Sequence, residues 1–227
     1  IEAAVDRYGI ACSFERTGEL SVATAPHQVP WLLEYADPGS GVEFLDRDAI
    51  RAEVSSPTYE AGLWDRHGTA MVHPARLAWG LARAAEELGV RIVERTKVLG
   101  IDTEPLALAT SGGTVRARQV ALGTNSFPML VRRLRLHTVP VYDYALMTEP
   151  LSTSQRAAIG WANRQGIGDS ANQFHYYRLS DDDRILFGGY DAVYRFGGHV
   201  ADRHDQRPAT FRTHAHHFLE TIPPLEE

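Results

Sequence analysis

The sequence has little cysteine and no excess of positive charge. Its 227 residues contain one cysteine, Cys12, which leaves no partner for an internal disulfide and excludes a four-cysteine zinc site. The formal net charge is −6, which argues against a nucleic-acid or anionic-membrane surface, because phosphate binding requires clustered lysine and arginine. No apolar run approaches the roughly 20 residues of a membrane span. We therefore expect a folded protein of a reducing compartment, the cytoplasm.

Several motifs of known chemistry are also missing from the sequence. There is no HExxH and no GxSxG, so neither a zincin helix nor an α/β-hydrolase elbow is indicated. His214 and His217 have the i, i+3 spacing of a chelating pair, but no further ligands accompany them, and we predict no metal site. The acidic run at 181–183 lacks the spacing of an EF-hand and predicts a solvated turn.

The first and last parts of the chain share one style. Residues 1–70 and 128–227 alternate short strand patterns with short helix patterns. A hairpin is expected at 174–188, and a single long strand at 139–148 would place Tyr142 and Tyr144 on one face. The other expected strands are 13–15, 19–24, 42–45 and 59–64, and the expected helices are 29–35, 153–159, one capped by Asp46 and one opened by Pro208.

The middle part, residues 71–127, has a different pattern. Pro74 suits the first position of a helix and Gly89 its C-terminal stop. A strand at 91–93, a small meander over 98–117 and a strand at 119–125 follow. The fold class we predict is α+β with an α/β insert, in which the chain crosses more than once between two domains.

Seven short segments of the chain match motifs of a known family, in the order in which that family carries them. Together they resemble the D-amino acid oxidase-type superfamily of FAD-dependent amine oxidoreductases, which includes glycine oxidase, sarcosine oxidase and gamma-glutamylputrescine oxidase-like proteins. Each segment alone is weakly specific. The resemblance rests on their order and spacing, and the segments together span nearly the whole chain. The segments are 68–74 (GTAMVHP), 84–92 (AAEELGVRI), 96–98 (TKV), 113–117 (GTVRA), 120–125 (VALGTN), 144–151 (YALMTEPL) and 184–189 (RILFGG).

The resemblance implies a domain organisation. Residues 1–70 and 128–227 would form an antiparallel-sheet substrate domain, and residues 71–127 would be part of a GR2-type FAD/NAD(P)-binding domain. The family opens with a strand–GxGxxG–helix that holds the FAD pyrophosphate, and this sequence has no GxGxxG. Gly188-Gly189 and Gly197-Gly198 lack that context. We therefore expect a central piece of a longer flavoprotein that does not hold FAD tightly alone.

Cofactor-side residues follow from the resemblance. Val98 corresponds to a position whose backbone lies against the adenine of FAD, although a buried strand valine explains it equally. Gly123 and Thr124 correspond to a strand end near the cofactor, where glycine permits close backbone approach. An ordinary strand-end turn remains the alternative for these two residues.

Substrate-side residues are also implied. Tyr176 matches a tyrosine that faces the substrate in glycine oxidase-like members, and Arg178 shares its strand face and could bind a carboxylate. A surface arginine on an exposed hairpin is the alternative for Arg178. Tyr190 falls where sarcosine oxidase carries a histidine near the flavin. Leu186 replaces the sarcosine oxidase lysine associated with oxygen activation, so both oxidase and dehydrogenase behaviour remain open.

The function implied by the resemblance is oxidation of the C–N bond of an amine or amino acid, by hydride transfer to FAD. The expected partner is a small amine or amino acid, with no nucleic acid and no membrane span, and the oligomeric state is undetermined. The alternative is a non-catalytic α+β module that binds a small ligand or another protein. A GxGxxG in flanking sequence would favour the enzyme.

Overall fold

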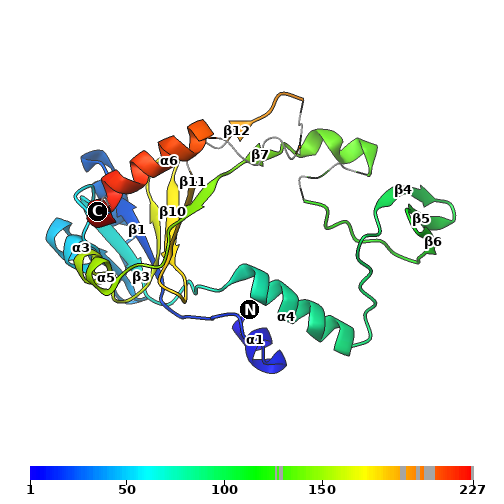
Figure 1. Cartoon of the computed structure of the whole chain (residues 1–227), viewed down its shortest axis with the longest axis horizontal. Helices are drawn as coiled ribbons and strands as arrows, with labels where there is room; N and C mark the ends of the chain where they lie inside the picture. The colour runs from blue at the N-terminus through cyan, green and yellow to red at the C-terminus, as the bar shows by residue number, and fades with distance from the viewer. Residues whose placement is uncertain (126, 128–129, 190–192, 198–199, 202–207, 226–227) are drawn as a thin grey trace. The chain divides into compact units, whose positions relative to one another are not determined.

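Two units make up the chain, and each is described by itself. Figure 1 shows a computed structural model that describes residues 1–125, 127, 130–189, 193–197, 200–201 and 208–225. The first unit comprises Ile1–Leu81, Asp143–Ala192 and Arg207–Glu227, and the second comprises Ala82–Tyr142 and Val193–Gln206.

A seven-stranded sheet organises the first unit. Distant parts of the chain meet in it, because β1 pairs in parallel with β9, whereas every other pairing in this sheet is antiparallel. The predicted hairpin is present as β10 and β11. In sheet order the strands are β2 (Val42–Leu45), β3 (Ala61–Asp65), β1 (Glu19–Ala23), β9 (Gly166–Asp169), β10 (His175–Leu179), β11 (Ile185–Gly189) and β8 (Ala145–Met147).

Short helices of the first unit begin at side-chain caps. Asp46 accepts the amide of Ala49 at the start of α3, as predicted, and Ser152 and Gln155 form a capping box at α5. Such caps satisfy amide groups that have no partner within the helix. The helical elements of this unit are α1 (Glu2–Tyr8), η1 (Pro26–Gln28), α2 (Val29–Glu34), α3 (Arg47–Glu53), α5 (Thr153–Ile159), α6 (Pro208–Thr221) and η4 (Pro223–Leu225).

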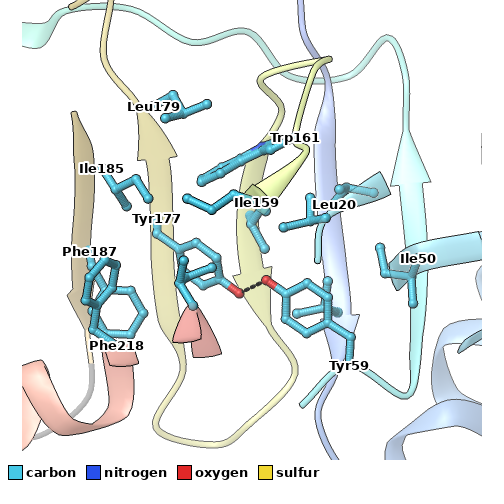
Figure 2. Close-up of a cluster of buried hydrophobic side chains, with 14 of the residues drawn as sticks. Leu20, Ile50, Tyr59, Ile159, Trp161, Tyr177, Leu179, Ile185, Phe187 and Phe218 are labelled. Carbon is cyan, nitrogen blue, oxygen red and sulfur yellow. Dashed lines mark hydrogen bonds between the residues drawn. The ribbon is translucent and has the colours of Figure 1, made fainter. Parts of the chain in front are cut away.

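One face of the sheet carries the main core. Alternate residues of each strand point to this face, which α6 crosses beside β8 and β11 (Figure 1). Phe187 packs against Phe218 of α6, with ring centroids 5.4 Å apart. Figure 2 shows Tyr59 and Tyr177 joined through their hydroxyl groups inside this cluster. Because both rings are fully enclosed, burial raises the pKa of each tyrosine.

Two smaller clusters complete the first unit. On the opposite face of the sheet, Ala23 and Ala61 pack with Leu32 of α2, so this helix covers one end of that face. Beside α1, Cys12 is buried with Val5 and Ile10. The lone cysteine therefore fills a core position.

The second unit contains the predicted meander. Strands β4 (Val98–Thr103), β5 (Leu106–Thr110) and β6 (Gly113–Arg116) form an antiparallel three-stranded sheet. Helix α4 (Pro74–Glu87) spans the division between the units and begins at Pro74 as predicted, and Gly89 follows it with a φ of 91°. The remaining elements are η2 (Arg132–His137), β7 (Val141–Tyr142) and β12 (Val193–Tyr194).

Some expected strands differ in the structure. Residues 91–93 and 119–125 form no regular strand, because a strand requires a hydrogen-bonded neighbour and no described strand pairs with them. Of residues 13–15, only Glu15 forms a bridge, to Met71. The long strand expected at 139–148 is also wrong, since β7 pairs with β12 whereas β8 pairs with β11. Tyr142 and Tyr144 therefore do not share a strand face.

None of the helices among the described residues has the length and apolar character needed to cross a membrane.

We expect Phe187→Ala to lower the free energy of unfolding by about 3–5 kcal/mol, because Phe187 is fully buried and its removal leaves a cavity in the core. Phe211→Ala on α6 is the matched control, since Phe211 is 61% exposed and its loss should cost less than about 0.5 kcal/mol. Urea denaturation followed by circular dichroism measures both values. Equal effects of the two substitutions would contradict the assignment of the core.

Candidate functional site

A cavity of about 420 Å³ opens on the sheet face opposite the main core, within the first unit. This volume lies within the usual range for small-molecule pockets. The wall is mainly apolar, and three polar side chains reach it from β1 and β10. The lining residues are Glu19, Ala70, Met71, Val72, Pro74, Gly166, Ile167, Tyr176, Tyr177, Arg178 and Leu186.

Strand alternation places these polar side chains. Tyr177 and Leu179 of β10 are buried in the main core, so Tyr176 and Arg178 point to the other face. This confirms the expectation that Tyr176 and Arg178 share a strand face. On β1, Leu20 enters the core and Glu19 accordingly lies on the cavity side.

Tyr176 is held by a carboxylate. Its hydroxyl donates a hydrogen bond to Asp143 Oδ2 at 3.0 Å, and the amide of Gly189 donates to Asp143 Oδ1 at 3.1 Å. Burial, then the hydrogen bond to Asp143 and the charge of that carboxylate, raise the pKa of Tyr176 to about 12. The phenol therefore stays protonated at neutral pH, with its position fixed by Asp143.

Two glycines leave room for the side chains above the sheet. A Cβ atom at Gly188 would lie 2.7 Å from Cζ and Oη of Tyr176, so the tyrosine ring lies directly over this glycine. A Cβ atom at Gly166 would lie 2.6 Å from Cε of Met71. Both distances are too short for ordinary contact, so a methyl group at either position would force the side chain above it to move.

Arg178 brings a guanidinium to the cavity. Its Nη1 donates a hydrogen bond to the carbonyl of Val72, and the side chain is half-buried. Burial lowers the pKa of Arg178, although the group remains charged at neutral pH. Among the described residues, no carboxylate lies within ion-pair distance of this guanidinium. An anionic or carbonyl oxygen in the cavity would therefore find an available donor.

Glu19 brings a carboxylate to the same cavity. The hydroxyl of Thr69 donates to its Oε2 at 3.0 Å, which fixes one oxygen. Its Oε1 lies 3.9 Å from where a Cβ atom of Gly168 would stand, above the middle of the sheet. Within the part of the chain that the structure describes, no cationic side chain forms an ion pair with Glu19.

Three other site residues expected from the sequence, Val98, Gly123 and Thr124, do not line this cavity. Val98 is the first residue of β4, and Gly123 and Thr124 lie in an irregular segment that follows β6, all within the second unit. Their roles toward a cofactor stay predictions. Tyr190 lies outside the described residues. Among the described residues, no group of three or more histidine, cysteine or acidic side chains could hold a metal ion.

Sequence reasoning missed two residues of this site. Glu19 has the alternating position of any surface glutamate on a strand, and no motif marks it. Asp143 was hidden because residues 139–148 were expected to form one strand. An acidic residue inside an otherwise apolar and aromatic strand pattern was the available signal for Asp143.

Comparison with known proteins identifies the family. The sequence profile of the family described as FAD dependent oxidoreductase matches residues 1–227. Gamma-glutamylputrescine oxidoreductase from Escherichia coli (strain K12) is 32% identical over 197 residues, which cover 82% of this chain and 45% of that protein. The chain belongs to the FAD-dependent oxidoreductase family, and it spans about half the length of the curated relative it matches.

Solved structures of two related enzymes share the fold. The glycine oxidase from Geobacillus kaustophilus has a TM-score of 0.75 and 18% identity, covering 99% of this chain and 59% of that one. The L-proline dehydrogenase from P. horikoshii has a TM-score of 0.74 and 18% identity, covering 99% of this chain and 60% of that one. At this identity the likeness supports the expected α+β architecture.

We expect Gly188→Ala to displace the ring of Tyr176 and break its hydrogen bond to Asp143, because the added methyl group would overlap the ring. The obstacle is a side chain, so the fold should persist with a melting temperature within a few degrees of wild type. Gly168→Ala is the control, since its methyl group would have only ordinary contacts. Crystal structures of both variants provide the measurement, and an unmoved Tyr176 in Gly188→Ala would contradict the expectation.

Proposed function

We propose that this chain forms the substrate pocket, and part of the FAD-binding region, of an enzyme that oxidises the C–N bond of an amine or amino acid. The observation that carries the proposal is the mainly apolar cavity in which Tyr176 and Arg178 meet, on a chain of the FAD-dependent oxidoreductase family. The curated relative named for a putrescine derivative and the solved structure of a glycine oxidase support a nitrogen-bearing substrate.

The residues of this chain suit the flat ring of FAD, but they do not supply the turn that would bind its pyrophosphate. The apolar cavity wall suits a flat organic ring and excludes water from one side of it. The pyrophosphate requires a glycine-rich turn between a strand and a helix, and the sequence has no GxGxxG. We assign residues 71–127 to the cofactor side, with Val98, Gly123 and Thr124 as candidate backbone contacts, and residues 1–70 and 128–227 to the substrate side.

When bound, FAD supplies the acceptor for the hydride that leaves the carbon beside the substrate nitrogen. The work of this chain is positioning. Arg178 would bind a carboxylate or carbonyl oxygen of the substrate, because its guanidinium reaches the cavity without a carboxylate partner among the described residues. Tyr176, held by Asp143, would close the cavity and keep a fixed hydroxyl at its wall. Leu186 lines the same wall and brings no charge to it.

A substrate panel tests the activity. The full-length protein with FAD is expected to be reduced anaerobically by at least one primary amine, secondary amine or amino acid. Arg178→Lys should raise the KM for carboxylate-bearing substrates at least tenfold, because lysine cannot reproduce the paired donors of arginine. Arg66→Lys is the control, since Arg66 pairs with Glu43 outside the cavity. Failure of every amine to reduce the flavin would favour a non-catalytic binding module.

The share of FAD binding that this chain provides is tested by absorbance. We expect the isolated 227-residue chain to purify without stoichiometric flavin, because it has no glycine-rich pyrophosphate turn. The full-length protein, purified in parallel, should show the absorption bands of oxidised flavin, including the band in the blue region of the spectrum. A stoichiometric flavin spectrum from the isolated chain would show that its own residues suffice to hold FAD.

A further inference from the structure

The cavity contains two opposite charges, and neither forms an ion pair among the described residues, although the carboxylates of Glu15 and Asp181 act on Arg178 at longer range. Arg178 binds the carbonyl of Val72, and Glu19 accepts the hydroxyl of Thr69. Several other acidic side chains of the first unit form ion pairs, including Glu15 with Arg164 and Glu60 with Arg47. A half-buried charge without a partner costs stability, so its retention in a cavity suggests that a ligand provides the partner.

The sheet register separates the two charges by one strand. Glu19 of β1 pairs with Gly166 of β9, and Tyr176 of β10 pairs with Gly168. Continuing the second register by two residues places Arg178 beside Gly166. Two strand spacings then separate the backbones of Glu19 and Arg178, roughly 10 Å. A ligand that touched both side chains would span Gly166 and lie against Met71, whose thioether occupies the space directly above that glycine.

The chemistry of amine oxidation restricts what Glu19 can bind. A nitrogen whose neighbouring carbon loses a hydride must be neutral, because its lone pair stabilises the cation that forms. A carboxylate within a few ångströms raises the pKa of an amine and keeps it as an ammonium ion. Glu19 is therefore badly suited to hold the reacting nitrogen, and well suited to hold a second nitrogen that stays charged.

We infer that Glu19 is the specificity residue for a second, non-reacting ammonium group, so that the substrate is a diamine derivative or a basic amino acid. This inference rests on the proposed amine oxidation. Arg178 would bind the oxygen-bearing part of such a substrate, while the apolar wall holds its methylene groups. Thr69 fixes Oε2 of Glu19, which leaves Oε1 for the ligand.

Two matched pairs of probes test the inference on the full-length protein with FAD. They are 1,5-diaminopentane with pentylamine, and lysine with norleucine, and the members of each pair differ by one terminal ammonium group. Dissociation constants are measured by anaerobic calorimetry, and kcat and KM wherever the flavin is reduced. The variants are Glu19→Gln, the partly disruptive Thr69→Val, and the control Glu43→Gln, whose carboxylate pairs with Arg66 outside the cavity.

For at least one pair, we expect the wild type to bind the diammonium or lysine member at least ten times more tightly, as measured by the dissociation constant or the KM. Glu19→Gln should remove this preference by raising the KM or the dissociation constant of the diammonium or lysine member. Thr69→Val should reduce the preference, and Glu43→Gln should keep it.

Three outcomes would overturn the inference. They are no preference in the wild type, an undiminished preference in Glu19→Gln, and an equal loss of kcat for every amine in that variant, which would indicate a proton-transfer role. If Glu19→Gln does not fold, an undiminished preference in Thr69→Val overturns the inference instead. If amines without a second charge reduce the flavin while any of these outcomes holds, the proposed oxidation stands and only the role of Glu19 fails.

Discussion

The parallel pairing of β1 with β9 is the constraint on which the site depends. It joins strands from residues 19–65 to strands from residues 145–189 in one sheet, so that Glu19 and Arg178 reach the same cavity. The amide of Ser170, the residue after β9, donates to the carbonyl of Val22 at 2.9 Å and extends this pairing. Parallel neighbours far apart in sequence cannot be joined by a tight turn, and this pairing therefore forms only when the whole unit folds.

The alternation of side chains along each strand places core residues on one face of the sheet and cavity residues on the other. Every second residue of β10 and β11 points into the core, where Tyr177 and Phe187 pack with Phe218 of α6. The residues between them, Tyr176 and Arg178, line the cavity. A slip of one residue in register would exchange the two faces, which would bury Arg178 in the core and expose the aromatic side chains. The packing of the core thus fixes the geometry of the site.

Local sequence patterns predicted much of the fold but only half of the polar site. Capping and glycine signals located α3 and α4, since Asp46 and Gly89 act through their nearest neighbours. The shared face of Tyr176 and Arg178 follows from spacing alone. Glu19 could not be predicted, because its place in the cavity depends on the pairing of β1 with β9, and no local pattern encodes a pairing between residues about 150 positions apart.

The same reasoning explains how one fold serves different amines. Relatives and neighbours of the chain are named for gamma-glutamylputrescine, glycine and L-proline, and their shared architecture sets the sheet rather than the ligand. We propose that selectivity arises from the charged positions of the mainly apolar wall, because an unpaired charge penalises a ligand that cannot neutralise it. In this chain those positions are Arg178 and Glu19, one of each sign. A ligand that satisfied only one of them would leave the other desolvated and unpaired, and the substrate we infer therefore carries a charge at both ends.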